Sequence, residues 1–144
     1  MPSDPSSCIF CKIVAGQVPA RIVARSEGAL AFLDVQPLAE GHTMVIPTHH
    51  HQHLPDLCPE DVDAVFRLAQ RVARAQREVL GAEAVTLGVN DGAAAGQVVP
   101  HLHVHLVPRR DGDGAGNVHA IFPTRGEPPT DALAECLAEA LQRS

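Results

Sequence analysis

The chain has 144 residues, 45% of them apolar, and a formal net charge of −6. The length suits one folded domain, and its core must be aliphatic because the sequence has no Trp or Tyr and only four Phe. The negative charge argues against binding to nucleic acid or to an anionic membrane, since both need a basic surface. The sequence shows neither a secretory leader nor the ~18 apolar residues of a membrane span, so we expect a cytoplasmic protein with reduced cysteines.

The first predicted elements are a short helix and a β-hairpin. The helix, over residues 9–14, overlaps a C-x-x-C pair formed by Cys8 and Cys11. This pair suits a metal site, a redox pair or neither, but it does not join a strand to a helix as thioredoxin-like chemistry requires. Two runs of β-forming residues, 21–25 and 29–35, flank a Ser-Glu-Gly turn and predict the hairpin. Asp34 near its end is either a turn cap or a carboxylate that accepts hydrogen bonds from ribose.

A third strand is predicted over residues 41–47, with His42 on the same face as Met44 and Ile46. The histidine-rich loop that follows is most often an exposed polar loop, although one of its members could complete a metal site with the C-x-x-C pair. Residues 59–80 are the clearest helix, with Pro at the first position and Gly81 at the end. Its predicted apolar stripe consists of Val62, Val65, Phe66, Ala69, Val72, Ala73, Val79 and Leu80. A fourth strand over 84–89 and a last helix over 131–142 complete the predicted elements.

The most unusual segment covers residues 98–108. Between its two prolines the residues alternate His, Leu, His, Val, His, Leu, Val, which is the period of a β-strand. Because alternate residues of a strand point to opposite faces, the histidines share one face and the aliphatic residues enter a core. The histidines are His101, His103 and His105, and the predicted core residues are Leu102, Val104 and Leu106.

Three imidazoles on one face are hard to explain as packing, and two chemistries remain. One is a metal site, since a His-x-His pair presents two nitrogens to zinc. The other is metal-free phosphoryl or nucleotidyl transfer, in which a neutral imidazole attacks phosphorus and its neighbours hold the phosphate oxygens. A loop of small residues over 90–97 leads into the histidine segment and would let a phosphate approach the backbone closely.

Several features together resemble the histidine-triad (HIT) family of nucleotide hydrolases and transferases, whose signature is His-φ-His-φ-His-φ-φ with φ apolar. The resemblance covers roughly residues 8–110 and is greatest to the Hint-like branch, including its bacterial members. A histidine at position 105 argues against the galactose-1-phosphate uridylyltransferase branch, which has glutamine there. Besides the three histidines, the matching features are Cys8-x-x-Cys11, Phe32 with Asp34, Gly41-His42 before a Val-Ile-Pro strand, Asn90 before the small-residue loop, and Gly96-Gln97.

We therefore expect an α+β domain with the HIT-like fold, in which an antiparallel sheet of about five strands packs with the long helix and a C-terminal helix. The predicted single domain is 1–144, with its core at about 8–110 and a C-terminal loop and helix over 111–144. The resemblance also implies a homodimer whose sheets join.

The resemblance implies a role for each histidine. His103 would be the nucleophile that attacks the α-phosphorus and carries a nucleotidyl intermediate. His105 would donate a hydrogen bond to phosphate or leaving group, His42 would support the nucleophile from the neighbouring strand, and His101 would orient His103. An unperturbed histidine, with a pKa of ~6.5, is mostly neutral at pH 7, as a nucleophile must be.

Substrate contacts are implied around these histidines. Asp34 would bind the ribose, and Asn90 and Gln97 would contact the phosphate and the leaving-group side. Relatives often have Ser or Thr after the glutamine, whereas this chain has Val98, so we expect one hydroxyl contact to phosphate to be missing. The residues expected to line the base pocket are Ile9, Phe10, Ile13, Phe32 and Val35.

Some bacterial Hint-like proteins bind structural zinc, and the matching ligands here are Cys8, Cys11, His50 and His101. His49 or His51 could take the place of His50. Two thiolates and two imidazoles form a closed tetrahedral site without a position for a reactive water. Such a site would attach the N-terminal segment to the catalytic strand and could not supply a metal-bound hydroxide.

The expected activity is hydrolysis of a purine nucleoside 5′-phosphoramidate to the monophosphate and an amine, through a covalent nucleotidyl-histidine. Three alternatives remain. The first is a dinucleoside polyphosphate hydrolase or nucleotidyl transferase. The second is a nucleotide-binding interaction module with little turnover, and the third is a zinc hydrolase that uses the His-x-His strand directly.

Overall fold

The computed structural model describes residues 4–144, which divide into two compact units. The first ends at Asp113 and contains the expected core, and the second runs from Gly114 to Ser144. The single-domain expectation for 1–144 stays a prediction, and its first three residues lie outside the described residues. None of the helices in the described part of the chain is long and apolar enough to cross a membrane.

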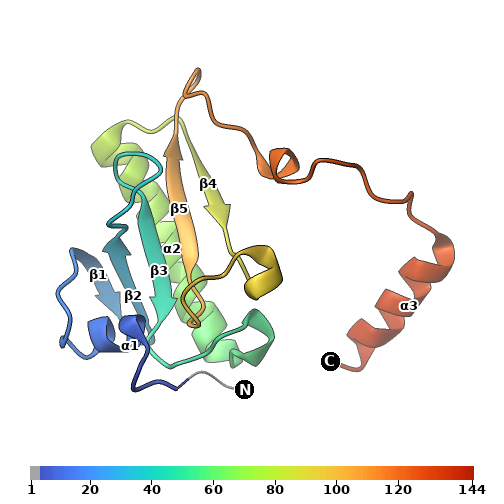
Figure 1. Ribbon diagram of the computed structural model, residues 1–144, viewed down its shortest axis with the longest axis horizontal. Helices are drawn as coiled ribbons and strands as arrows, with labels where there is room; N and C mark the ends of the chain where they lie inside the picture. Colours follow the sequence, from blue (N-terminus) through green and yellow to red (C-terminus); the bar gives the residue numbers. More distant parts are fainter. Residues whose placement is uncertain (1–3) are drawn as a thin grey trace. The chain divides into compact units, whose positions relative to one another are not determined.

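The first unit is built on an antiparallel sheet of five strands among the described residues, as predicted (Figure 1). A hairpin of β1 (Ile22–Ser26) and β2 (Ala29–Leu33) continues into β3 (Thr43–Pro47). The last strand in the chain, β5 (Val104–Arg109), lies between β3 and β4 (Ala84–Gly88), which forms the edge. Strand β5, which carries His105, is therefore an inner strand of the sheet.

A 22-residue helix, α2 (Pro59–Leu80), covers one face of this sheet and contacts β2, β3 and β5 (Figure 1). It has the predicted bounds, and Gly81 ends it in the left-handed conformation at φ 62°. Its buried face differs from the predicted stripe, because Phe66 is 43% exposed and Val79 77% exposed. The prediction is confirmed for Val65, Ala69 and Val72, and the helix also buries Asp61, Leu68 and Gln76, which lie outside the predicted stripe.

The opposite face of the sheet carries α1 (Ile9–Val14) and a second apolar cluster. Phe10 and Ile13 of α1 pack there with Phe32 of β2 and Met44 of β3. Met44 pairs across the ladder with His105, so the catalytic candidate lies in the same row as these apolar side chains. This face therefore forms the floor of the candidate site.

Strand β5 begins later than the alternation predicts, because His101 lies in a bend and His103 in irregular backbone before it. Its pairing with β3 stops at Val45–Val104, and the end of β3 is Pro47, which has no N–H to donate to a longer ladder. The N–H of Leu102 donates instead to His51 O at 2.7 Å. The face prediction is confirmed for the aliphatic residues, since Leu102, Val104 and Leu106 are at most 1% exposed.

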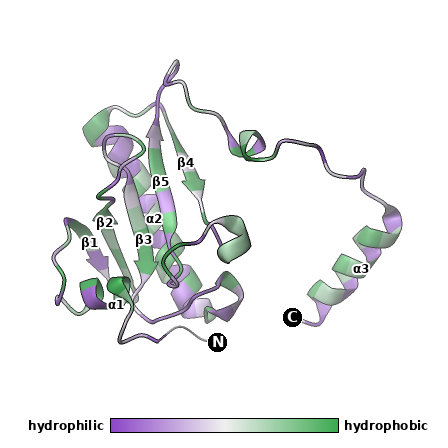
Figure 2. Ribbon diagram, in the orientation of Figure 1, coloured by the Kyte–Doolittle hydropathy of each residue, from purple (hydrophilic) through white to green (hydrophobic). Residues whose placement is uncertain are grey.

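Short 3-10 turns interrupt the loops of the described chain, namely η1 (Leu54–Asp56), η2 (Ala93–Ala95) and η3 (Val118–Ile121). In the second unit η3 precedes α3 (Asp131–Gln142), which matches the predicted last helix. Thr130 caps α3 by accepting the N–H of Leu133 at its Oγ1. Figure 2 shows apolar and polar positions alternating along α3.

Candidate active site

The histidines of the triad lie close together on the α1 side of the sheet. The ring centroids of His103 and His105 are 4.9 Å apart. Phe10 of α1 packs edge-on against the rings of both His103 and His101, at 5.2 and 5.9 Å. His101 is fully buried and His103 is 8% exposed. The imidazole of His103 is therefore held between the ring of Phe10 and that of His105.

The protonated ring nitrogen of His103 follows from its hydrogen-bond partner. Its Nδ1 lies 2.7 Å from His101 O, and a carbonyl oxygen can only accept, so Nδ1 carries the hydrogen. In the neutral ring the lone pair is then on Nε2. This is the protonation that a nucleophile attacking phosphorus needs, and it is fixed by the backbone of the same segment.

A second chain of hydrogen bonds fixes the ring nitrogens of His42 and His105. The N–H of Leu38 donates to His42 Nδ1 at 3.1 Å, so the hydrogen of the neutral His42 ring is on Nε2. That Nε2–H donates to His105 Nδ1 at 2.9 Å. His105 must then carry its own hydrogen on Nε2, where it is a donor beside His103. An acceptor nitrogen and a donor nitrogen thus lie on neighbouring rings.

The protein keeps this pair neutral. Burial lowers the pKa of His42, and the nearby Asp34 carboxylate opposes this only in part. Burial, together with the neighbouring His103 and His42, lowers the pKa of His105 to about 4. Asp34 Oδ2 lies 3.6 Å from His42 Nε2, while Oδ1 accepts the N–H of Gln36 at 2.8 Å. The site can therefore offer hydrogen bonds to an anion without first gaining a proton.

His101 and three further side chains form a partly buried cluster on the other side of His103. Their ligand atoms all lie within 4.8 Å of one another, and they are Cys8, Cys11, His50 and His101. His101 Nδ1 lies 3.5 Å from each sulfur, because its Nε2–H donates to Pro47 O at 2.8 Å. Burial lowers the pKa of His101 to about 4, so its Nδ1 keeps a lone pair. Burial and the Cys8 thiol raise the pKa of Cys11 to about 11, so thiolates here need a neighbouring cation.

The structure also separates His50 from its neighbours in the histidine-rich loop. His50 Nδ1 lies 3.2 Å from Cys11 Sγ, whereas His49 and His51 turn to the Asp61 carboxylate at 3.0 Å. Burial raises the pKa of Asp61, but hydrogen bonds from His49, Cys58 and His51 outweigh this and lower it. Asp61 therefore fixes the loop so that His50, and not its neighbours, faces the thiols.

The small-residue loop before the triad is tied to the same histidine-rich loop. Gln97 Nε2 donates to Gln52 O and Val99 O, and its Oε1 accepts the N–H of Gly92. His53 Nδ1 also lies 2.8 Å from Asp91 Oδ1. A direct contact from Gln97 to phosphate would break one of these bonds, so we expect this residue to shape the loop.

Comparisons with known proteins agree with this geometry. The HIT domain family matches residues 15–112. The chain belongs to the HIT family. An uncharacterised HIT-like protein of Mycobacterium tuberculosis is 40% identical over 134 residues, which are 93% of this chain and 92% of that protein. The adenosine 5′-monophosphoramidase of Saccharomyces cerevisiae is 37% identical over 106 residues, which are 74% of this chain and 65% of the yeast protein.

A solved structure is similar to this protein over nearly its full length. It is described as a zinc-bound histidine triad family protein from Mycobacterium smegmatis and superposes with a TM-score of 0.74 at 40% identity. The superposition covers 97% of this chain and 96% of the other. The sequence-based identification of the family and of its fold is confirmed.

The remaining predicted residues of the HIT domain lie in two groups. Phe10, Ile13 and Phe32 are buried in the cluster beneath the triad, which suits a wall for a base. Ile9 is 41% exposed and Val35 84% exposed, so any contact from them is at the rim. Asn90 and Val98 are also exposed, and they follow β4 and the small-residue loop.

Sequence reasoning missed two features of this site. Asp61 is not among the predicted site residues, although an acid two residues after Pro59 and close to a histidine-rich loop could have suggested a partner. Gly88 of β4 pairs with His105, and a Cβ there would meet nothing within 4 Å. The sheet therefore leaves open space beside the donor imidazole, where a substrate group can lie.

Proposed function

We propose that this HIT protein hydrolyses purine nucleoside 5′-phosphoramidates at the α-phosphate. The observation that carries this proposal is the fixed pair of nitrogens, an acceptor Nε2 on His103 beside a donor Nε2–H on His105. Nucleophilic attack on phosphorus needs the first, and the phosphate or the departing nitrogen needs the second. The name of the similar yeast protein supports an adenosine phosphoramidate as the substrate class.

In the proposed reaction, His103 Nε2 forms a bond to the α-phosphorus while the bond from phosphorus to nitrogen breaks, and the departing nitrogen takes a proton from solvent and leaves as the amine. His101 O accepts the hydrogen of His103 Nδ1 and so stabilises the charge that the ring gains. Water then attacks phosphorus and loses a proton to solvent, the bond to His103 breaks, and the monophosphate leaves. Asp34 binds the ribose in this proposal, and Phe10 and Phe32 form the wall for the purine.

The test is a hydrolysis assay with adenosine 5′-phosphoramidate. We expect turnover by the natural chain and a fall of at least about a thousandfold in kcat for His103→Ala, because the nucleophile is removed. His119→Ala, which changes an exposed histidine of the second unit, is the matched control and should keep full activity. Equal turnover by His103→Ala would exclude this mechanism. Absence of turnover in the natural chain would favour dinucleoside polyphosphates or a binding module instead.

We also propose a structural zinc ion held by Cys8, Cys11, His50 and His101. The donor set is one that zinc prefers, and the similar Mycobacterium smegmatis structure is described as zinc-bound. Bound there, the ion would hold the two thiolates and connect the start of α1 to the segment that carries His103. Metal analysis of the purified chain should give about one zinc per chain, and its absence would exclude the proposal.

A homodimer in which two sheets join is the proposed assembly. Strand β4 lies at an edge of the sheet, with Leu87 48% exposed, and an unpaired edge can add a strand from a second copy. The mass in solution measured by light scattering should be that of two chains, and Leu87→Arg should halve it. A monomeric natural chain would exclude this assembly.

A further inference from the structure

Gln76 of α2 reaches the backbone on both sides of the active histidine pair, from the opposite face of the sheet. It is only 4% exposed, and its Nε2 donates to Gly41 O and to Leu106 O, each at 3.0 Å. Gly41 immediately precedes His42, and Leu106 immediately follows His105. One amide group thus connects the two backbone segments that present the pair.

The sheet cannot make this connection with its own backbone. At the end of the ladder that is nearer to Gly41, pairing of β3 with β5 stops at Thr43–Leu106, although β5 continues to Arg109. Beyond that point Pro108 lies opposite Gly41, with its Cγ 3.6 Å from where a Cβ at position 41 would be. Because proline has no N–H, it cannot donate to the carbonyl of Gly41. The side chain of Gln76 supplies the missing donor.

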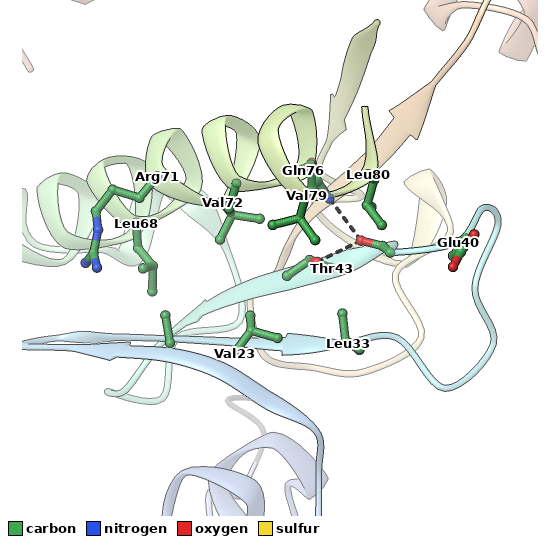
Figure 3. Close-up of a pocket in the computed structure, with 13 residues that line it drawn as sticks. Val23, Leu33, Glu40, Thr43, Leu68, Arg71, Val72, Gln76, Val79 and Leu80 are labelled. Carbon is green, nitrogen blue, oxygen red and sulfur yellow. Dashed lines mark hydrogen bonds between the residues drawn. The ribbon is translucent and has the colours of Figure 1, made fainter. Parts of the chain in front are cut away.

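Among the described residues, the other hydrogen bonds of the Gly41 carbonyl and of the loop backbone stay on the β3 side. Thr43 Oγ1 donates to the same carbonyl at 2.8 Å, as Figure 3 shows, but Thr43 belongs to β3 itself. The preceding loop closes on itself, since Asp34 N donates to His42 O and His42 N donates to Ala39 O. Beyond the last ladder pair, the bridge from Gln76 is therefore a link between this loop and the strand of His105.

The amide of Gln76 also has an unfavourable side, because one of its two polar atoms is buried without a hydrogen bond. Both of its acceptors are carbonyls, so the NH₂ group must face them and the amide cannot be reversed. The Oε1 atom is then buried without a hydrogen-bond partner among the described residues. An unpaired buried acceptor destabilises the folded state, and the two hydrogen bonds from the NH₂ group to backbone carbonyls must offset that cost.

We propose that Gln76 is a positioning residue for the catalytic histidines. By bridging Gly41 and Leu106, it keeps His42 Nε2 within 2.9 Å of His105 Nδ1 and so keeps the hydrogen of His105 on Nε2, facing the substrate. Loss of the bridge widens this gap and lets His105 carry its hydrogen on either nitrogen. The expected effect on turnover rests on the proposed function, whereas the effect on the imidazoles does not.

The test compares Gln76→Met, which keeps the length and removes the donor, with Gln70→Met at an exposed position of the same helix. Nitrogen-15 NMR of the imidazoles in the unliganded protein should show one neutral form of His105, protonated at Nε2, in the natural chain and in Gln70→Met. In Gln76→Met we expect a mixture of both forms. With adenosine 5′-phosphoramidate, kcat of Gln76→Met should fall about tenfold to a hundredfold while KM stays within about twofold, because a displaced donor acts on the transition state.

An unchanged imidazole spectrum in Gln76→Met would overturn the proposal, even if its thermal midpoint were lower. If the natural chain did not hydrolyse the phosphoramidate, the proposed function would fail while the NMR comparison still decided the role of Gln76. If Gln76→Met does not fold, Gln76→Glu serves instead, since a protonated carboxyl can donate to only one of the two carbonyls and an ionised carboxylate can donate to neither. Its His105 should then show the mixture of both forms at pH 7, and a single form protonated at Nε2 would overturn the proposal.

Discussion

Two clusters of metal-binding residue types lie on either side of His103, and they differ in how their imidazoles are held. In the thiol cluster, His101 gives its Nε2–H to Pro47 O, which leaves Nδ1 facing Cys8 and Cys11. In the second cluster, formed by Asp34, His42 and His105, the ligand atoms also lie within 4.8 Å of one another. There the facing nitrogens of the two histidines are hydrogen-bonded to each other.

The backbone partners explain this difference. A carbonyl on the far nitrogen of His101 puts the hydrogen there and leaves the near nitrogen as a ligand. The far nitrogen of His42 instead accepts the N–H of Leu38, so the near nitrogen of the neutral ring carries a hydrogen and cannot bind a cation. Both clusters hold metal-binding residue types with their ligand atoms within 4.8 Å of one another, but only the first is prepared for a metal. The second is prepared to donate hydrogen bonds.

The largest expected effect comes from breaking the thiol cluster. Cys11→Ser should abolish zinc binding and lower the free energy of unfolding by on the order of 4 kcal/mol, because a bound metal contributes directly to folding. Thermal denaturation should show a midpoint about 10 °C lower or more. The matched control is Cys136→Ser, since Cys136 is exposed in α3. A Cys11→Ser chain with the zinc content and midpoint of the natural chain would contradict the comparison.

The second effect comes from the donor cluster. His105→Asn removes the Nε2–H beside His103, and we expect kcat for adenosine 5′-phosphoramidate to fall by about a hundredfold, as for other lost transition-state donors. Zinc content should not change, since His105 is not a member of the thiol cluster. Loss of zinc from this variant would show that the clusters are not independent.

A third, smaller effect is expected in the pH dependence of stability. The pKa of His105 in the folded chain is about 4, and that of His42 is also lowered, against ~6.5 in an unfolded chain. Below pH ~6.5 the unfolded chain therefore binds more protons, and the free energy of unfolding falls as the pH drops toward 4, by at most about 1.4 kcal/mol per pH unit for each histidine.

Urea denaturation at a series of pH values measures this slope. It should be shallower in His105→Asn than in the natural chain, and unchanged in His119→Gln, which alters an exposed histidine. Comparing the variants separates the donor cluster from acid release of zinc, which all three chains share. Identical slopes in all three would mean that His105 does not remain neutral on folding.

The comparison also shows which parts of the molecule the sequence can predict. Local spacing predicts the bounds of α2 and the burial of Leu102, Val104 and Leu106. A motif predicts that Cys8 and Cys11 lie with His101. The choice of His50 over His49 and His51 does not, because it depends on Asp61, ten or more residues away. Gln76 was likewise missed, since its partners come from the turn before β3 and from β5. The periodicity of apolar residues predicts which side chains are buried. Hydrogen bonds between segments far apart in the sequence decide which ring nitrogen of a histidine carries the hydrogen.

The smallest expected effect on turnover is that of Asp34→Asn. Asp34 opposes the lowering of the pKa of His42 and His105, so its loss lowers both further, yet both are already neutral at pH 7. We therefore expect kcat to change little. KM should rise by about tenfold, because a carboxylate is a stronger acceptor than an amide for the ribose hydroxyls. Glu27→Gln, an exposed acid in the β1–β2 turn, is the control.

A substrate without ribose hydroxyls separates the two roles of Asp34. With the 2′,3′-dideoxy form of adenosine 5′-phosphoramidate, the natural chain and Asp34→Asn should have the same KM, since the group that Asp34 binds is absent. If Asp34→Asn instead lowers kcat equally for both substrates, the carboxylate acts through His42, 3.6 Å away, and belongs to the donor cluster itself. The difference between the two clusters would then rest on a charge as well as on the backbone partners of the rings.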